Sequence, residues 1–164
     1  MAANNIWAPW RMSYILDKSD PQPEGGCLFC DLARREAQAD NLILFRGPEA
    51  YIVLNRYPYS SCHLLVVPRL HARQLSELDE RSYQGLMGLL RQTVAALERA
   101  VNPSGVNLGV NLGETAGAGI ADHLHFHVVP RWSGDHNFMP VIANTMVMPE
   151  HLEATYDRLK PFFA

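Results

Sequence analysis

Three histidines stand at alternate positions in the last third of the chain. Residues 122–132 read DHLHFHVVPRW and contain His123, His125 and His127, three of the seven histidines. Side chains alternate between the two faces of a β-strand, so the three imidazoles are predicted to share one face while the residues between them enter the core. A lone buried histidine usually has a structural role, whereas this row of titratable groups indicates a functional site.

The spacing of the row argues against one metal ion held by all three rings. The outer two Cα atoms would lie about 13 Å apart at a strand rise of about 3.3 Å per residue, whereas a Zn–N bond is about 2.0 Å. We therefore expect the histidines to have different roles. A neutral imidazole is a competent nucleophile near pH 7, and a neighbouring ring can donate to a phosphoryl oxygen or protonate a leaving group. Phosphate chemistry fits this division.

A glycine-rich segment, Asn111-Leu-Gly113-Glu-Thr-Ala-Gly117-Ala-Gly119, comes shortly before the histidines. Glycines let the backbone approach a phosphate, and their N–H groups can bind its charge. The pattern alone also fits a flexible turn, and it points to phosphate only through the histidines beside it. The sequence contains no P-loop lysine motif, which argues against a kinase or ATPase of that class.

Cys27 and Cys30 form a C-x-x-C pair, which fits a redox dithiol, half of a zinc site, or two buried small residues. Zinc needs two more ligands, which His71 and His123 could supply, and the resulting site would tie the N-terminal segment to the sheet. Zinc is favoured over reduced, metal-free thiols. The third cysteine, Cys62, is expected to pack in the core, and the neighbouring His63 to satisfy a backbone group.

Length and charge exclude several classes of protein. The 164 residues (18.4 kDa) suit one domain with a core that needs no disulfides. The net charge is −3, and the densest basic cluster is the pair Arg34-Arg35, so nucleic acid is not expected as a partner. No apolar run approaches the roughly 20 residues that span a bilayer, and the opening MAANNIWAPW does not resemble a signal peptide. We expect a cytoplasmic protein that does not bind membranes.

The elements that position these residues predict an α+β fold with an antiparallel sheet and helices on one face. An aromatic arm at residues 7–14 precedes a linker-like stretch, residues 17–26, and is expected to pack against the domain or a second subunit. The long helix has one predicted buried stripe: Tyr83, Met87, Leu90, Val94, Leu97 and Val101. Predicted strands are Leu42–Phe45, Tyr51–Leu54, His63–Val67, Val106–Leu112 and His123–Pro130. Predicted helices are Leu28–Ala37, one from a cap at Ser76 or Asp79 to about Ala100, and one opening at Met148-Pro149-Glu150 and reaching Lys160.

The row of histidines resembles the motif of the histidine triad (HIT) superfamily, and the resemblance covers most of the chain. An arm with Trp10-Arg11-Met12 and the tail Asn137-Phe138-Met139-Pro140 are similar to a bacterial branch associated with diadenosine tetraphosphate phosphorylase. Further matching segments occur in the expected order: Cys27-x-x-Cys30, Asn55-Arg-Tyr-Pro58, His63 to Pro68 with His71, Asn111-x-Gly113, Pro130-Arg131-Trp132 and Asp135-x-Asn137-Phe138.

The resemblance implies a HIT-like fold in which residues 1–26 form an arm and linker and residues 27–164 a single HIT domain. It also implies a homodimer whose sheets join across the interface. His125 would attack the α-phosphorus of a dinucleoside polyphosphate and become nucleotidylated, while His127 contacts the phosphate. His123 would be a zinc ligand or a structural support.

The resemblance further implies which residues hold the substrate. Asn111 and the backbone of Gly117, Ala118 and Gly119 would bind the phosphates, and Asn55 would belong to the nucleoside pocket. Cys62 occupies a position where family members usually have glycine. Two other activities fit the same residues: a nucleoside phosphoramidate hydrolase, and a purine-nucleotide-binding regulator with little turnover. An interaction protein organised by zinc or thiols is a more distant alternative.

Overall fold

A computed structural model describes residues 26–135, 138, 139, 142 and 150–163. The aromatic arm, His136, Met148 and Pro149 lie outside these residues. The predicted α+β class is confirmed: a five-stranded antiparallel sheet, in the order β1-β2-β3-β5-β4, packs with one long helix and a C-terminal helix. The elements are α2 (Leu28–Leu32), β1 (Ile43–Arg46), β2 (Ala50–Leu54), β3 (Leu64–Pro68), η1 (Leu75–Glu77), α3 (Glu80–Val101), β4 (Gly105–Val110), η2 (Glu114–Ala116), β5 (Phe126–Arg131), α5 (Leu152–Leu159) and η3 (Lys160–Phe163).

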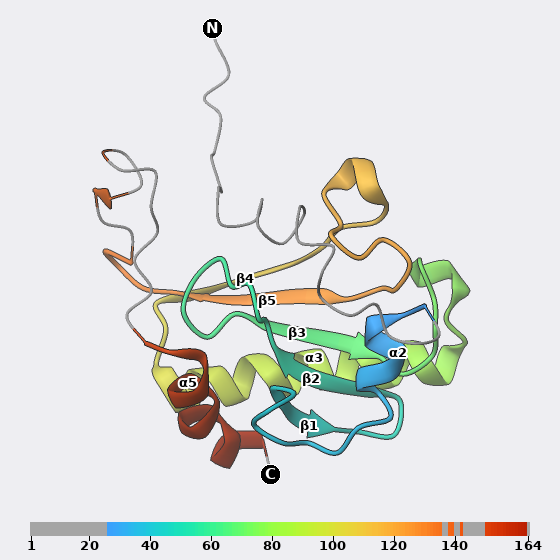
Figure 1. The fold of residues 1–164 in the computed structure, drawn as a ribbon, viewed down its shortest axis with the longest axis horizontal. Coiled ribbons are helices and arrows are strands. Elements are labelled where there is room, and N and C mark those ends of the chain that lie inside the picture. The colour runs from blue at the N-terminus through green and yellow to red at the C-terminus, as the bar shows by residue number, and fades with distance from the viewer. Residues whose placement is uncertain (1–25, 136–137, 140–141, 143–149, 164) are drawn as a thin grey trace, which may run out of the picture.

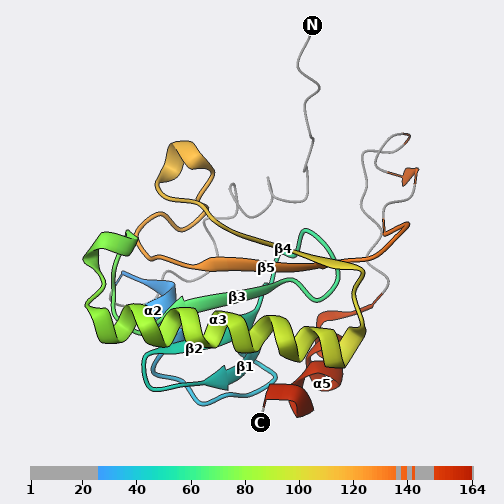
Figure 2. The same cartoon turned by 180° about the vertical axis from the view of Figure 1, so that it is seen from behind.

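The two faces of the sheet are covered differently. The long helix α3 crosses one face and contacts β2, β3 and β5 (Figure 2). The short helix α2 lies on the opposite face, in front of the strands in Figure 1, so the prediction that the helices share one face is wrong. Strands β2 and β3 are buried along their whole length because they lie in the middle of the sheet. Because α2 is much shorter than α3, the face that carries α2 has more room for a functional site.

Helix α3 begins at Asp79, whose carboxylate accepts a hydrogen bond from the Ser82 N–H at 2.7 Å. Asp79, not Ser76, is therefore the cap. The predicted buried stripe is wrong in part, because the helix is rotated so that Tyr83 is 41% exposed. Thr93 lies on the buried face and satisfies its hydroxyl by donating to the Leu89 carbonyl at 2.8 Å. The residues of α3 that are buried are Ser82, Leu86, Leu89, Leu90, Thr93, Ala96 and Leu97.

Several predicted boundaries are also wrong. Helix α2 ends at Leu32, not Ala37, because the Asn41 side chain binds the backbone of the following turn: its amide donates to the Glu36 carbonyl at 2.7 Å. Strand β4 ends at Val110, and β5 begins at Phe126. Residues 123–125 lie before β5, because the Leu124 N–H donates to the Ala72 carbonyl at 2.7 Å.

The C-terminal segment covers the β1 edge of the sheet. The last helix begins at Leu152, after an exposed His151 at its N-cap, and so starts later than predicted. The Tyr156 hydroxyl donates to the Ile43 carbonyl at 3.2 Å, and the Lys160 ammonium donates to the Leu44 carbonyl at 2.7 Å. Helices in the described part of the chain are too short or too polar to cross a bilayer.

Candidate functional site

The histidine row lies on the face of the sheet that carries α2. His123 and His125 are 1% and 5% exposed, while His127 is half-buried on β5. Leu124, Phe126 and Val128 are buried, so the predicted alternation holds although the strand begins only at Phe126. The rings of His125 and His127 meet edge to face, with centroids 5.0 Å apart.

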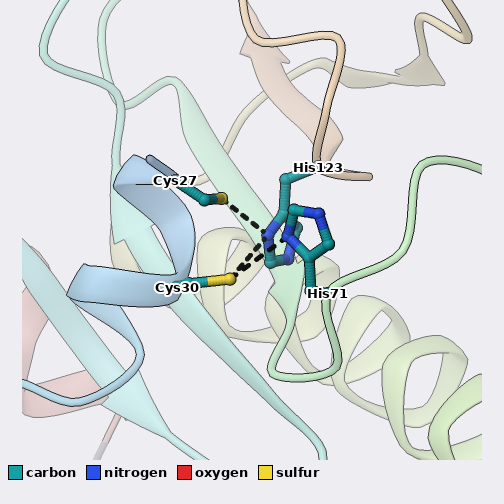
Figure 3. A group of neighbouring side chains, drawn as sticks. All are labelled: Cys27, Cys30, His71 and His123. Carbon is teal, nitrogen blue, oxygen red and sulfur yellow. Dashed lines mark hydrogen bonds between the residues drawn. The ribbon is translucent and has the colours of Figure 1, made fainter. Parts of the chain in front are cut away.

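His123 leaves the row and joins Cys27, Cys30 and His71 (Figure 3). Its Nδ1 atom lies 3.2 Å from the Cys27 sulfur and 3.6 Å from the Cys30 sulfur. The Nδ1 atom of His71 lies 3.2 Å from the Cys30 sulfur. The four ligand atoms all lie within 4.8 Å of one another. These are the four residues that the sequence predicted to share a metal, and we call them the Cys/His cluster.

The geometry and chemistry of the cluster fit a tetrahedral ion. Zn–S and Zn–N bonds of about 2.3 and 2.0 Å place sulfur and nitrogen ligands about 3.5 Å apart, close to the separations found here. The Nε2 atom of His123 donates to the Pro68 carbonyl at 2.9 Å, which leaves Nδ1 as the ligand atom and orients the ring. Burial lowers the pKa of His123 to about 4, so the ring is neutral at neutral pH. Burial raises the pKa of the Cys30 thiol to about 11, and an arriving metal ion must therefore displace its proton.

One hydrogen bond determines which ring nitrogen of His125 carries the proton. The Nδ1 atom lies 2.8 Å from the His123 carbonyl oxygen, which can only accept, so Nδ1 carries the proton. Burial lowers the pKa of His125, which keeps the ring neutral. The hydrogen-bond network thus assigns a lone pair to Nε2, the arrangement that a nucleophilic imidazole needs.

His127 is oriented by His63, a residue whose part in the site the sequence analysis missed. The Tyr59 N–H donates to the His63 Nδ1 atom at 3.1 Å, so the proton of a neutral His63 lies on Nε2. That Nε2 atom is 2.9 Å from the His127 Nδ1 atom. His127 therefore accepts at Nδ1 and carries its own proton on Nε2, an atom that is itself buried. His63 does satisfy a backbone group as predicted, but it also selects the tautomer of His127.

The residues between β2 and β3 support this pair. The Asn55 side chain has its Nδ2 atom 3.2 Å from the His63 Nδ1 atom, and its Oδ1 atom accepts from the Tyr57 N–H at 3.0 Å. The Tyr59 ring lies over His63, with centroids 4.7 Å apart. Buried Cys62 has a φ of 59°, the left-handed conformation that glycine favours. The segment therefore keeps a glycine-type turn directly before His63.

The glycine-rich segment forms an exposed turn between β4 and the histidine row. Gly113 and Gly117 have φ values of 87° and 91°. The Asn111 amide donates to the Gly117 carbonyl at 3.3 Å, and the Ala118 N–H donates to the Gly113 carbonyl at the same distance. Asn111 therefore holds the turn in shape. The Gly117 and Ala118 N–H groups are both used inside the turn.

Comparisons with known proteins show which family and which individual proteins this chain is similar to. The HIT domain family model matches residues 36–134. The AP-4-A phosphorylase of Mycobacterium tuberculosis (strain CDC 1551 / Oshkosh) is 36% identical over 155 residues, which cover 92% of this chain and 79% of the relative. A hypothetical histidine triad nucleotide-binding protein from Sulfolobus tokodaii strain7 superposes with a TM-score of 0.66 at 27% identity, covering 83% of this chain and 88% of the other. A Zn-bound histidine triad family protein from Mycobacterium smegmatis gives a TM-score of 0.65 at 21% identity, covering 83% and 91%.

Proposed function

This chain belongs to the HIT domain family, and from that membership and the arrangement of its histidines we propose that it cleaves dinucleoside polyphosphates by nucleotidyl transfer through His125. The family assignment supports a nucleotide hydrolase or transferase. The similarity to an AP-4-A phosphorylase supports diadenosine tetraphosphate as the substrate and inorganic phosphate as the acceptor.

In the first step the Nε2 atom of His125 attacks the α-phosphorus. A P–N bond forms, the bridging P–O bond to the β-phosphate breaks, and ATP leaves with the electrons of that bond. The Nδ1 proton stays on the ring and faces the His123 carbonyl, which stabilises the positive charge that the ring gains. His127 donates its Nε2 proton as a hydrogen bond to the phosphoryl oxygen or the leaving oxygen.

In the second step inorganic phosphate attacks the nucleotidyl-histidine. Its oxygen forms the new P–O bond, the P–N bond breaks, and ADP leaves while the lone pair returns to Nε2. Asn111 and the turn at Gly117, Ala118 and Gly119 would bind the phosphate chain, with Gly119 offering its N–H because the other two are used within the turn. Asn55 would border the nucleoside, which its position beside His63 supports.

The observation that carries this proposal is the hydrogen bond from His125 to the carbonyl of His123. It supports an unprotonated Nε2 atom on a buried, neutral ring, next to a second ring whose Nε2 atom is protonated. A nucleophile and a hydrogen-bond donor then lie side by side, an arrangement suited to attack on phosphorus with stabilisation of the charge on its oxygens.

The test is to incubate the protein with diadenosine tetraphosphate, with and without inorganic phosphate, and to resolve the products. We expect ADP and ATP, in equal amounts, only when phosphate is present. ATP and AMP without phosphate would identify a hydrolase. Absence of cleavage in both reactions, with turnover of a nucleoside phosphoramidate, would replace the proposed substrate class.

His125→Ala should abolish turnover and leave nucleotide binding measurable by calorimetry. His151→Ala is the matched control, because His151 is exposed and makes no side-chain cap hydrogen bond at the start of α5. The assignment of the nucleophile would be contradicted if His125→Ala retained turnover. It would also be contradicted if the wild-type protein never formed a nucleotidyl adduct with an acid-labile P–N bond.

We further propose that the Cys/His cluster binds zinc. Two thiols and two imidazoles are a typical tetrahedral zinc set, and the Mycobacterium smegmatis relative is described as Zn-bound. When bound, the ion would tie the Cys27–Cys30 turn to His71 and His123 and take no part in bond breaking. Elemental analysis should find one zinc per chain. Cys27→Ser should lose it, and Cys62→Ser, outside the cluster, should keep it.

The open edge of the sheet supports the proposed homodimer. Among the described strands, β4 pairs only with β5, and Leu108 on it is 50% exposed. Pairing of two β4 strands would join the sheets and cover this surface. Leu108→Lys should convert a dimer to a monomer in light scattering. Leu70→Lys, at a residue 42% exposed in a loop, should not.

A further inference from the structure

Phe29 connects the Cys/His cluster to the proposed nucleophile. It stands between Cys27 and Cys30 on α2 and is 2% exposed. Its ring lies against His125, with centroids 4.9 Å apart, and meets His123 edge to face at 5.6 Å. The segment that presents the two sulfurs, Cys27 and the first turn of α2, therefore also presents the side chain that packs on His125.

The turn that carries Phe29 is also held from the sheet. The Tyr51 hydroxyl on β2 donates to the Phe29 carbonyl at 2.8 Å, within the buried core. Burial raises the pKa of Tyr51, so the hydroxyl keeps the proton that it donates. This hydrogen bond holds α2 to the sheet, while the sulfurs of Cys27 and Cys30 point toward the rings of His71 and His123 (Figure 3). The position of Phe29 is therefore fixed by the Tyr51 hydrogen bond and by the contacts of Cys27 and Cys30 in the Cys/His cluster.

A second route joins the cluster to His125 through the backbone. The carbonyl of His123 accepts the Nδ1 proton of His125 at 2.8 Å, and the ring of His123 lies in the cluster. His125 thus has one neighbour on each of two segments, Phe29 on α2 and His123 before β5. These two segments meet at the cluster, where sulfur and nitrogen atoms are 3.2 to 3.6 Å apart.

The cluster is open to exchange on one side. His71 is exposed, whereas His123 is buried, so an ion can enter or leave past His71. With an ion bound, metal–ligand bonds join the two segments. With protonated thiols, the same atoms are held only by weak S–H···N hydrogen bonds, which allow the segments to move separately. The rigidity of the contact between Phe29 and His125 therefore depends on whether the Cys/His cluster holds an ion.

We propose that Phe29 is a positioning residue for His125, through which binding of a thiophilic divalent cation at the Cys/His cluster sets the orientation of the nucleophile. The proposal rests on the proposed function of His125. Phe29 touches neither substrate nor ion; it limits the rotation of the His125 ring about its side-chain bonds. A ring held in the attacking orientation reacts faster without binding the substrate more tightly.

The activity test compares Phe29→Ala and Phe29→Leu with Phe163→Ala in the full-length, zinc-loaded protein. Phe163 is the matched control because it is similarly buried, 6% exposed, in η3 at the C-terminal end of the chain. We expect Phe29→Ala to lower kcat on the order of 100-fold with KM within about threefold. Phe29→Leu, which keeps an apolar side chain and the fold, should show a smaller loss in kcat alone. Phe163→Ala should keep the wild-type kcat.

The second readout needs no turnover. The Nδ1 proton of His125, bonded to a carbonyl in a buried site, should give a slowly exchanging imidazole signal in ¹⁵N-resolved NMR. We expect the signal in zinc-loaded wild type and Phe163→Ala. It should broaden or disappear after chelation and in Phe29→Ala, whose zinc content should remain one per chain. Added zinc should restore the signal in chelated wild type and Phe163→Ala but not in Phe29→Ala.

Two results would overturn the proposal: a kcat of Phe29→Ala no lower than that of Phe163→Ala, or a His125 signal unchanged by chelation. Failure of the proposed function is distinguishable. A wild-type protein that cleaves no dinucleoside polyphosphate while its His125 signal still follows zinc would refute the substrate assignment and retain the coupling.

Discussion

The hydrogen bond between His63 and His127 gives the sharpest prediction about the mechanism. The Nε2 atom of His63 donates to the Nδ1 atom of His127 at 2.9 Å, and the Tyr59 N–H binds the other nitrogen of His63. His63→Asn removes the donor to His127 together with the ring that packs against Tyr59, and His63→Gln loses the same ring, so the comparison of the two variants isolates the donor. Its side-chain oxygen can replace Nδ1 as acceptor for Tyr59, while its side chain is too short to reach His127. His63→Gln places an amide N–H near the former Nε2 position.

The size of the effect follows from the atom left without its donor. A buried acceptor that loses its partner costs about 1–3 kcal/mol. At 1.36 kcal/mol per factor of ten, this corresponds to about 5- to 160-fold in kcat if the cost falls on the transition state. The tautomer of His127 is then no longer fixed, and the ring can present a lone pair instead of a proton to the phosphoryl group.

The assay is steady-state cleavage of diadenosine tetraphosphate by His63→Asn, His63→Gln and the exposed-histidine control His151→Ala. We expect His63→Asn to lose kcat by that factor, His63→Gln to recover most of it, and His151→Ala to match wild type. Equal kcat values for the Asn and Gln variants would refute the assignment of the tautomer by His63. A change confined to KM would show that His63 acts on binding instead.

Three further predictions concern stability and reactivity. Gly85→Ala should destabilise the protein, since its Cβ would lie 2.6 Å from the Glu49 Cβ atom, whereas Gly88→Ala, with open space around its Cβ, should stabilise α3 by about 1 kcal/mol; denaturant unfolding that ranks the two equally would contradict this. Burial raises the pKa of the Cys62 thiol to about 11, so alkylation of the folded protein should be slow at pH 8 and accelerate as the pH approaches that value; fast labelling at pH 8, as in denatured protein, would show that the thiol is exposed. Asp79→Ala should lower the free energy of unfolding by about 1 kcal/mol, because the cap of α3 is lost; an unchanged denaturation midpoint would exclude this role.

The Cys/His cluster could be predicted because cysteine and histidine are the residue types that most often bind zinc. Cys27 and Cys30 have the C-x-x-C spacing of half a zinc site, so only the two histidine ligands remained to be chosen. His63 was not predictable in the same way. Its contact with His127 depends on the register of β3 against β5, which pairs Leu65 with His127 and so brings His63 to the same end of the site. A hydrophobic pattern predicts that two strands exist but not which residues face each other.

The long helix shows where periodicity is insufficient. Its apolar residues at three- and four-residue steps predict one buried stripe that includes Tyr83, but Tyr83 is exposed in the structure. The observed face contains Ser82 and Thr93, which the apolar pattern alone does not select. Thr93 is buried because its hydroxyl donates within the helix at 2.8 Å, a contact that offsets the cost of removing it from water. This hydrogen bond within the helix therefore allows a polar side chain to lie on the buried face.

The hydrogen bonds that Tyr156 and Lys160 donate to carbonyls of β1 limit how the sheet can assemble with other copies. Because these groups occupy carbonyls at one border of the sheet, another strand can add there only by displacing them, whereas none of the described strands pairs with the outer side of β4. A sheet with a single available border can combine with one copy of itself about a two-fold axis and then has no border left for a third. Assembly would end as a closed pair and could not propagate into a filament. Tyr156 and Lys160 would thus prevent the sheet from growing at its β1 border.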